Sequence, residues 1–236
     1  MRNTITITAK EFKSYLASPM AYIVIGIFLV LSGFFFGTSQ DTYSTTSLSG
    51  FLQIGSLLLL LLTAVLTMRL LAEERKLGTI ELLLTAPVRD SEIILGKFFG
   101  SLGVIVVMLI LTLYYPILLK VFGDPDIGPM ATGYLGLFLL SCASLAIGIF
   151  ASSLTSNQIV AAVVAGGILF GLWFLGSAAT YLPKALGDVI GYFSLSNYFP
   201  DFIRGIIDTR GIIYYLSITV LFLFLAMRSL ENSRWS

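Results

Sequence analysis

The sequence contains no histidine, a single cysteine and few charged residues. Without histidine, the chain cannot build a His-based metal site, a Ser-His protease centre or an H-E-x-x-H zinc protease. The one cysteine, Cys142, lies in an apolar stretch and can form no intrachain disulfide, so we expect it to pack in a core. These absences exclude several classes of enzyme.

A phosphate-binding loop is also missing. No G-x-x-x-x-G-K-[ST] motif occurs, because Gly96-Lys97 has neither the upstream glycine nor the following hydroxyl residue. We therefore expect that the chain binds no nucleotide and no other cofactor itself, and that it has no nucleic acid partner.

Long apolar runs account for most of the chain. Hydrophobic residues make up 57% of it, charged residues 11%, and the mean hydropathy is +0.94. A membrane-crossing helix needs about 20 mostly apolar residues. Six uncharged stretches of that kind occur, at 20–37, 51–68, 98–119, 130–154, 159–179 and 211–227. The sequence predicts an all-α polytopic membrane protein whose residues 1–236 form a single transmembrane domain.

Other classes of protein fit these runs less well. A soluble core would keep polar faces at a period of 3.6 or 2, whereas "LLLLLLTAVL" is apolar all round. The alternating segments of a membrane β-barrel are not seen. The first stretch is longer than the roughly 7–15 apolar residues of a signal peptide and no clear cleavage site follows it, so we expect a retained span.

Acidic residues are absent from all six expected spans. An intramembrane carboxylate would be expected of an aspartyl protease or of a proton-coupled carrier. Without one, the sequence offers no evident way to use an ion gradient.

The charges that do occur are concentrated between Arg69 and Lys97, which hold ten of the 27 charged residues. With the N-terminus inside, the basic residues divide ten to four in favour of the cytoplasmic side. Both termini and the charged segment are therefore expected in the cytoplasm. By contrast, the expected cytoplasmic turn at 152–158 is short and uncharged.

Within the charged segment, the residues predict a short helix over 79–86. Gly78 interrupts the chain, Thr79 can cap a helix, Glu81 suits its first turn and Pro87 ends it. The apolar side chains Ile80, Leu83 and Leu84 share one face. This helix either lies on the bilayer or is offered to a soluble partner.

The same segment resembles the ABC type-2 permeases, which are membrane subunits of ATP-driven transporters. The resemblance is carried by Glu74-Arg75, Gly78-Thr79-Ile80-Glu81, Leu83-Leu84, Pro87 and Gly96-Lys97. "KEFKSYLASPMAY" (10–22) is similar to the interfacial helix of the family, which enters the first span through a Ser-Pro pair. Residues 146–161 and 204–219 are similar to the gliding-motility-associated permease subgroup.

This resemblance implies a six-span permease that pairs with a second copy or a related membrane subunit, and that rests on a separate ABC ATPase, which binds the ATP. It implies ATPase-coupling roles for Glu74, Arg75, Gly78, Thr79, Glu81, Leu83, Leu84 and Pro87. Lys10, Glu11, Phe12 and Pro19 would belong to the interfacial helix. The expected function is to couple ATP hydrolysis to export or to mechanical signalling.

The segment 180–210 between the last two spans is aromatic and amphipathic. In related permeases such a stretch forms short re-entrant helices that close the exit, which implies an external gate at Tyr198, Phe199, Asp201 and Arg204. The alternative is a loop that lies at the membrane interface with an aromatic belt. In both cases an extracytoplasmic auxiliary protein could act there.

Two further patterns concern helix packing. Small residues recur at Gly96, Gly100 and Gly103 and at Ala162, Gly166 and Gly171, with small-xxx-small spacing in the first pair of each row, and either row could form a dimer face. In the N-terminal segment an apolar face, which predicts a helix in the headgroup plane, is formed by Ile5, Ala9, Phe12 and Leu16.

Two other functions remain open from the sequence. A passive channel would need a filter or a polar lining and would conduct without a partner. A structural membrane anchor for an extracytoplasmic assembly would need only the spans. Polar residues inside the spans are too common to indicate a cargo.

Overall fold

The computed structural model describes residues 2–42, 47–79, 88–123 and 125–232. These residues form helices joined by short turns, and none of them lies in a strand. The helices are α1 (Arg2–Ala17), α2 (Pro19–Thr42), α3 (Ser49–Thr67), α4 (Ala72–Lys76), α6 (Asp90–Leu111), α7 (Tyr114–Phe122), α8 (Ile127–Ser153), α9 (Gln158–Ala179), α10 (Lys184–Tyr192), α11 (Phe199–Ile203) and α12 (Thr209–Asn232).

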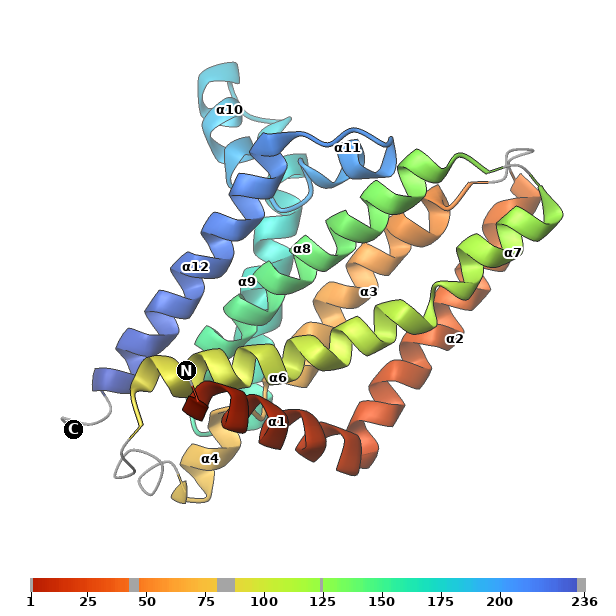
Figure 1. Ribbon diagram of the computed structural model, residues 1–236. Helices are drawn as coiled ribbons and strands as arrows, with labels where there is room; N and C mark the ends of the chain where they lie inside the picture. The colour runs from red at the N-terminus through yellow and green to blue at the C-terminus, as the bar shows by residue number, and fades with distance from the viewer. Residues whose placement is uncertain (1, 43–46, 80–87, 124, 233–236) are drawn as a thin grey trace.

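Six helical stretches of the described chain are long and apolar enough to cross a membrane, as predicted. They are α2, α3 with its continuation to Lys76, α6 with α7 to Val121, α8, α9 and α12. Helices α1 and α4 lie at the end of the bundle that also holds Arg2 and Asn232, and α10 and α11 lie at the opposite end (Figure 1). We refer to these as the terminal end and the far end.

Helix α8 is the centre of the bundle. It packs against α3, α6, α9, α11 and α12, and most of its side chains are buried. Small residues make these approaches close, since a Cβ added at Gly148 would collide with the side chain of Thr67 on α3. The hydroxyls of Ser141 and Ser144 donate to the carbonyls four residues earlier, which allows polar side chains to be buried in the apolar core. Cys142 is buried there, as expected.

The third membrane-crossing stretch differs from the expected range 98–119. Helix α6 begins at Asp90, where the Glu92 carboxylate accepts from the Arg89 backbone N–H at 3.2 Å and caps the first turn. The helix therefore begins before the expected range 98–119, whose residues are uncharged, and it also carries Asp90, Glu92 and Lys97. Polar first-turn residues and a partner for Lys97 allow the longer helix.

Between α6 and α7 the same stretch is interrupted at Thr112 and Leu113. Pro116 has no N–H, so the Thr112 carbonyl cannot receive its usual helical hydrogen bond. This carbonyl instead accepts from the Tyr115 N–H at 3.0 Å, within the turn, and from the Tyr134 hydroxyl on α8 at 2.8 Å. A local and a tertiary contact together replace the helical hydrogen bond that the proline removes.

Candidate functional site

Helix α4, which begins the connection between α3 and α6, lies at the terminal end (Figure 1). Of the residues expected to couple an ATPase, Glu74 and Arg75 lie on α4 and are half-buried, while Gly78 and Thr79 follow it and are exposed. The remaining ones, Glu81, Leu83, Leu84 and Pro87, lie outside the described residues. So does the helix expected over 79–86, except for Thr79.

Gly78 ends α4 by a change of backbone direction. Its φ is +70°, a left-handed conformation that only glycine adopts without strain. The Gly78 N–H donates to the Arg75 carbonyl at 3.2 Å, and the Thr79 hydroxyl donates to the Glu74 carbonyl at 3.4 Å. Gly78 therefore sets the direction in which the connection continues beyond α4.

The start of α4 is held by Ser152, at the end of α8. The Ser152 hydroxyl accepts from the N–H groups of Leu71 and Ala72, both at 3.1 Å, and donates to the Met68 carbonyl at 3.2 Å. The sequence analysis treated 152–158 only as a turn and missed this residue. No local signal marks it, because its partners are about 80 positions away.

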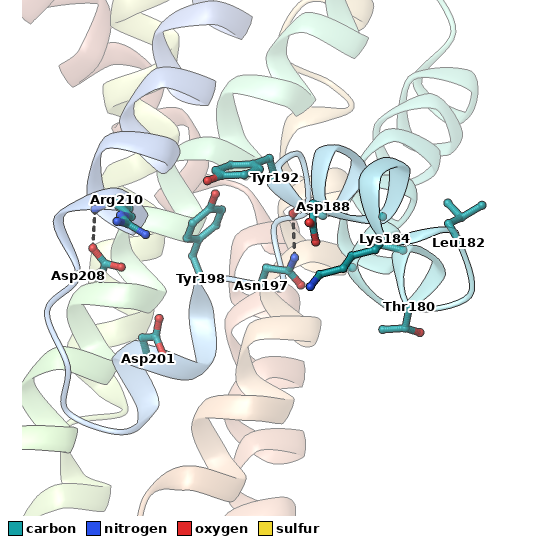
Figure 2. Close-up of a pocket in the computed structure, with 14 residues that line it drawn as sticks. Thr180, Leu182, Lys184, Asp188, Tyr192, Asn197, Tyr198, Asp201, Asp208 and Arg210 are labelled. Atoms are coloured by element: carbon teal, nitrogen blue, oxygen red, sulfur yellow. Dashed lines mark hydrogen bonds between the residues drawn. The ribbon is translucent and has the colours of Figure 1, made fainter.

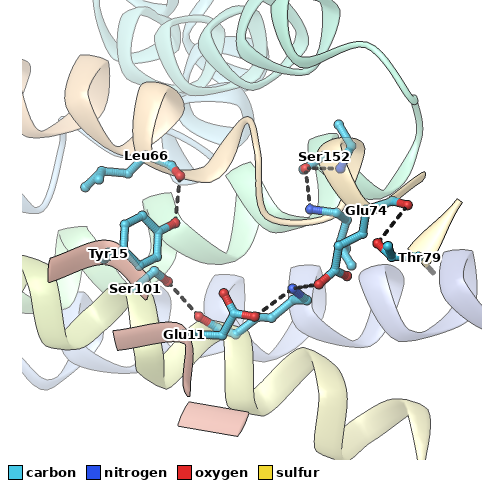
Figure 3. A network of polar contacts seen from close by, with 10 residues as sticks. Glu11, Tyr15, Leu66, Glu74, Thr79, Ser101 and Ser152 are labelled. Atoms are coloured by element: carbon cyan, nitrogen blue, oxygen red, sulfur yellow. Dashed lines mark hydrogen bonds and ion pairs between the residues drawn. The ribbon is translucent and has the colours of Figure 1, made fainter. Parts of the chain in front are cut away.

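Lys97 is the centre of a buried ionic contact between three helices. Its ammonium lies 2.7 Å from Glu74 Oε1 on α4 and 3.0 Å from Glu11 Oε1 on α1, and only 2% of the Lys97 side chain is exposed (Figure 3). We call Glu11, Glu74 and Lys97 the ionic triad. A buried charge is tolerated in a protein only when it is paired in this way.

The sequence analysis named both glutamates among the site residues. It used Lys97 in the charge count, in the exclusion of a phosphate-binding loop and in the family resemblance, but it assigned Lys97 no contact. A signal for it does exist, since Lys97 is a lone cation between the apolar groups Ile93-Ile94-Leu95 and Phe98-Phe99. Such a residue is expected to have a buried partner.

Helix α1 is able to reach the triad because α6 presents a row of glycines to it. A Cβ at Gly96 would lie 2.6 Å from the Ile7 side chain, one at Gly100 would lie 2.6 Å from the Glu11 Cβ, and one at Gly103 would lie 2.9 Å from the Phe12 ring. This row is therefore filled by α1 of the same chain. It is not left free for a dimer face.

A second set of contacts holds the other end of α1. The Tyr15 hydroxyl donates to the Leu66 carbonyl at 2.8 Å, and the Arg69 guanidinium lies 4.6 Å above the Tyr15 ring and donates to the Ser18 hydroxyl at 3.0 Å. Burial raises the pKa of the Tyr15 phenol, which keeps it protonated as a donor. The α1 helix is thus fixed both to α6 and to the end of α3.

The outward face of α1 carries three of the four residues of the predicted apolar face. Ile5, Ala9 and Leu16 are exposed, whereas Phe12 turns toward α6, and the position of the helix in the headgroup plane stays a prediction. Lys10 is exposed, and Pro19 opens α2 directly after the bend at Ser18.

A crevice of about 230 Å³ separates α1 from α4 beside the triad. Its charged lining is balanced and comprises Lys10, Glu11, Arg69, Glu73, Glu74 and Lys97. The second carboxylate oxygen of Glu74, Oε2, is buried and has no hydrogen-bond partner among the described residues.

At the far end, the chain after α9 forms the short helices α10 and α11 and returns into the bundle. The Leu195 N–H donates to the Leu172 carbonyl at 3.1 Å, and the Ser196 hydroxyl donates to the Trp173 carbonyl at 2.8 Å. Leu172 lies seven residues before the end of α9, so the segment re-enters by about 10 Å at 1.5 Å per residue. Exposed aromatic side chains also occur here, at Tyr181, Tyr192 and Phe193.

The four residues expected at an external gate occupy different environments. Phe199 is buried, Tyr198 stacks on Tyr214 with ring centroids 4.6 Å apart, Asp201 is half-buried and Arg204 is exposed. Tyr198 and Asp201 line a cavity of about 820 Å³ that opens between α10 and the start of α12 (Figure 2). Arg204 does not line it.

A family model described as ABC-2 family transporter protein matches residues 34–226, which is most of the chain. The chain belongs to the ABC-2 transporter family. No match was found among curated proteins.

Family membership indicates the general role of the chain. An ABC-2 chain is a membrane component of an ABC transporter, and the family in general implies an ABC ATPase partner. The matched range includes Glu74 and Lys97 but not Glu11, which lies on α1. This chain is therefore a multi-pass membrane protein of the permease type.

Proposed function

We propose that this ABC-2 protein is the permease subunit of a bacterial ABC transporter. It couples ATP hydrolysis by a separate nucleotide-binding subunit to export or to mechanical signalling across the inner membrane. In this arrangement the terminal end and both chain termini face the cytoplasm, in keeping with the ten-to-four division of basic residues.

The observation that carries the proposal is the ionic triad. A charged connection at the terminal end is useful for coupling only if a push on it moves the spans. Glu74 links α4 to Lys97 on α6, and Lys97 links α6 to Glu11 on α1. Ser152 links the start of α4 to the central helix α8.

Because of these links, α4 can pass a movement of the ATPase on to the membrane helices. Coupling requires contacts that differ between two states of the complex, and packed elements respond as units rather than by gradual deformation. Displacement of α4 would strain its contacts to α6 and α8 and, through Lys97, the contact between α6 and α1. We assign the ATPase docking surface to α4 and the residues from Gly78 to Pro87.

The charges of the expected docking segment indicate the chemistry of the partner surface. The carboxylate of Glu81 calls for a basic donor on the ATPase. ATP itself is bound by that partner, since this chain has no phosphate-binding loop and is proposed to have no catalytic site.

Two further partners complete the proposal. A second copy or a related membrane subunit would pack against an exposed helix face, and α9, which is the least buried of the six long helices, leaves Gly166 and Gly171 open. Lipid covers the remaining apolar surface. An extracytoplasmic auxiliary protein would meet the far end at α10 and α11.

We propose mechanical signalling as an alternative to export because residues 146–161 and 204–219 are similar to the gliding-motility-associated subgroup. In that case the movement of α10 and α11 would itself be the output. Opening of an exit at Tyr198 and Phe199 would be the output in the case of export.

The test uses the full chain with its cognate ATPase in proteoliposomes. We expect the isolated chain to hydrolyse no ATP, and the complex to hydrolyse ATP at a rate that depends on the permease. Glu81→Lys is expected to reduce association with the ATPase, since like charges across an interface cost several kcal/mol. Glu231→Lys, an exposed acid at the same end on α12, is the matched control.

Three outcomes would refute the proposal. ATP hydrolysis by the isolated, pure chain would contradict the assignment of ATP to a partner. Ion conduction by the chain alone would favour a channel. A cellular phenotype that persists unchanged with a catalytically inactive ATPase would favour a structural anchor.

A further inference from the structure

The third membrane-crossing stretch has different neighbours on the two sides of its break. On the terminal side, α6 packs most closely against α1 and also contacts α8 and α12. On the far side, α7 lies beside α2 (Figure 1). One span of the chain is thus divided between two groups of helices.

The start of α7 is joined to α2 by Tyr115. The Tyr115 side chain is buried, and its hydroxyl donates to the Leu29 carbonyl at 3.3 Å and lies 2.8 Å from Ser32 Oγ. A Cβ at Gly33 would lie 3.3 Å from the same hydroxyl, so the glycine leaves room for it. The Tyr115 ring also packs on Phe36, with ring centroids 4.6 Å apart. These contacts fix the position of α7 on α2.

The backbone at the break has the hydrogen-bond pattern of a tighter helix. The N–H groups of Thr112, Leu113 and Tyr115 each donate to the carbonyl three residues earlier, at 3.1, 3.0 and 3.0 Å. Pro116 follows directly and supplies no donor. Such a 3₁₀ stretch within a longer helix often marks a hinge.

The break is supported by the central helix. The Tyr134 hydroxyl on α8 lies 2.8 Å from the Thr112 carbonyl oxygen and 3.2 Å from the Thr112 hydroxyl oxygen, and Thr112 is fully buried. Helix α8 is the most buried of the six long helices. Thr112 can therefore stay in place while the helices on its two sides change their angle.

From these observations we propose that Thr112 and Leu113 form a hinge at which α6 changes its angle to α7, while α7 stays on α2. The alternative is a rigid kink, locked by the same contacts of Tyr115 and Tyr134. The two differ in how much the distance between α6 and α7 varies.

The hinge has a consequence for coupling, and this consequence rests on the proposed function. The ATPase would move α6 through the contact of Lys97 with Glu74. An unbroken helix would carry this movement to the far end as a rigid body, whereas a hinge lets α7 remain with α2. The unbroken α8 is then the route by which the movement reaches the far end.

The test uses the isolated full chain in lipid nanodiscs and measures distances between pairs of spin labels in a Cys142→Ala background. Phe99→Cys and Val121→Cys lie on the two sides of the break, at side chains that are 47% and 71% exposed. A straight helix would hold them about 33 Å apart. The matched pair, Leu135→Cys and Leu154→Cys, lies along the unbroken α8 and its C-cap, about 28 Å apart. Excess unlabelled protein restricts the measurement to distances within one chain.

We expect the distance distribution across the break to be about twice as wide as that of the α8 pair. Pro116→Ala restores the missing N–H and should narrow the distribution to the width of the α8 pair. Pro129→Ala changes a proline in the first turn of α8, where no helical hydrogen bond is missing, and should leave the distribution across the break unaltered.

Thermal unfolding of each variant is measured alongside. If Pro116→Ala does not fold, Tyr134→Phe replaces it. This variant removes the hydroxyl that supports Thr112, and it should widen the distribution across the break.

A third pair tests whether α7 stays on α2. Val30→Cys and Val121→Cys place labels on these two helices, at side chains that are 70% and 71% exposed. We expect a distribution as narrow as that of the α8 pair, and a wide one would overturn the proposal. A distribution across the break that is as narrow as the α8 pair and is unchanged by Pro116→Ala would also overturn it, since that is the behaviour of a rigid kink.

The consequence for coupling is tested separately, with the cognate ATPase bound and trapped by vanadate. We expect the mean distance across the break to shift and the mean distance between α2 and α7 to stay the same. Absence of a shift in a complex that hydrolyses ATP would overturn the consequence for coupling. If no ATPase binds, the proposed function fails, and the distributions of the isolated chain still decide whether the hinge exists.

Discussion

Among single residues, Lys97 has the most demanding environment. A charge that is 98% shielded from water at the edge of an apolar helix is tolerated because two carboxylates contact it. Glu11 and Glu74 remain 13% and 20% exposed, so each of them reaches water as well. Lys97 therefore relies on Glu11 and Glu74 for its polar contacts. The two glutamates rely less on Lys97, because water also reaches them.

Lys97→Met is expected to destabilise the protein by about 3 kcal/mol, since it leaves two acidic groups without their shared cation. Further replacement of Glu11 and Glu74 by Gln should recover part of this loss, because uncharged partners no longer need a cation. Thermal unfolding in detergent gives the stability, and ATPase stimulation in the complex gives the coupling. Strictly additive losses would argue against a triad that acts as a unit.

Among the elements, α1 packs on the bundle with one face and is exposed on the other. Its inner face packs on the glycine row of α6 and contributes Glu11, and its outer face exposes Ile5 and Leu16. An amphipathic helix that only rested on the membrane would not need such a fit. The tight contact instead fixes where the carboxylate of Glu11 lies.

Gly100→Leu tests this packing. Its Cβ would lie 2.6 Å from the Glu11 Cβ and 3.3 Å from the Thr8 carbonyl oxygen, so α1 has to move away from α6. Overpacking of this kind costs about 1–3 kcal/mol. We expect a lower unfolding temperature and faster tryptic cleavage at Lys10 and Lys13.

The control for this experiment is Gly26→Leu on α2, where an added Cβ meets nothing within 4 Å. It changes a membrane-helix glycine to the same residue without a collision, and we expect little change in stability or in cleavage. If the two variants behaved alike, the contact between α1 and α6 would not be the cause.

At the scale of the whole molecule, the two ends of the bundle differ in chemistry. The terminal end is held by ion pairs and serine or tyrosine hydrogen bonds, and the far end is closed by aromatic side chains around a polar cavity. The central helix α8 touches both regions, through Ser152 at one end and through Thr132, which donates to the Phe202 carbonyl at 2.7 Å, at the other. One rigid helix thus joins the two.

The orientation of these ends is testable by labelling. In a Cys142→Ala background, Lys76→Cys at the terminal end should react with an impermeant maleimide only from the cytoplasmic side. Tyr181→Cys, at a side chain that is 91% exposed, should react only from outside. Labelling of both positions from the same side would contradict the proposed arrangement of six spans.

Much of this architecture follows from local properties of the chain. Apolar stretches of membrane length predict spans wherever they occur, so the six helices and the charged connection near 69–97 could be predicted without knowing any contact. The left-handed Gly78 and the Ser18-Pro19 boundary between α1 and α2 are local as well. The start of α6 at Asp90 was missed because apolarity alone does not mark a polar first turn.

The sequence by itself determined which segments cross the membrane, since insertion depends on the composition of about 20 neighbouring residues. Only the tertiary structure decided that Glu11 and Glu74 share Lys97, that Ser152 holds α4, and that Tyr115 joins α7 to α2. These contacts join residues up to 86 positions apart. They depend on how each helix is rotated about its own axis against its neighbours, which the packing of the complete bundle sets.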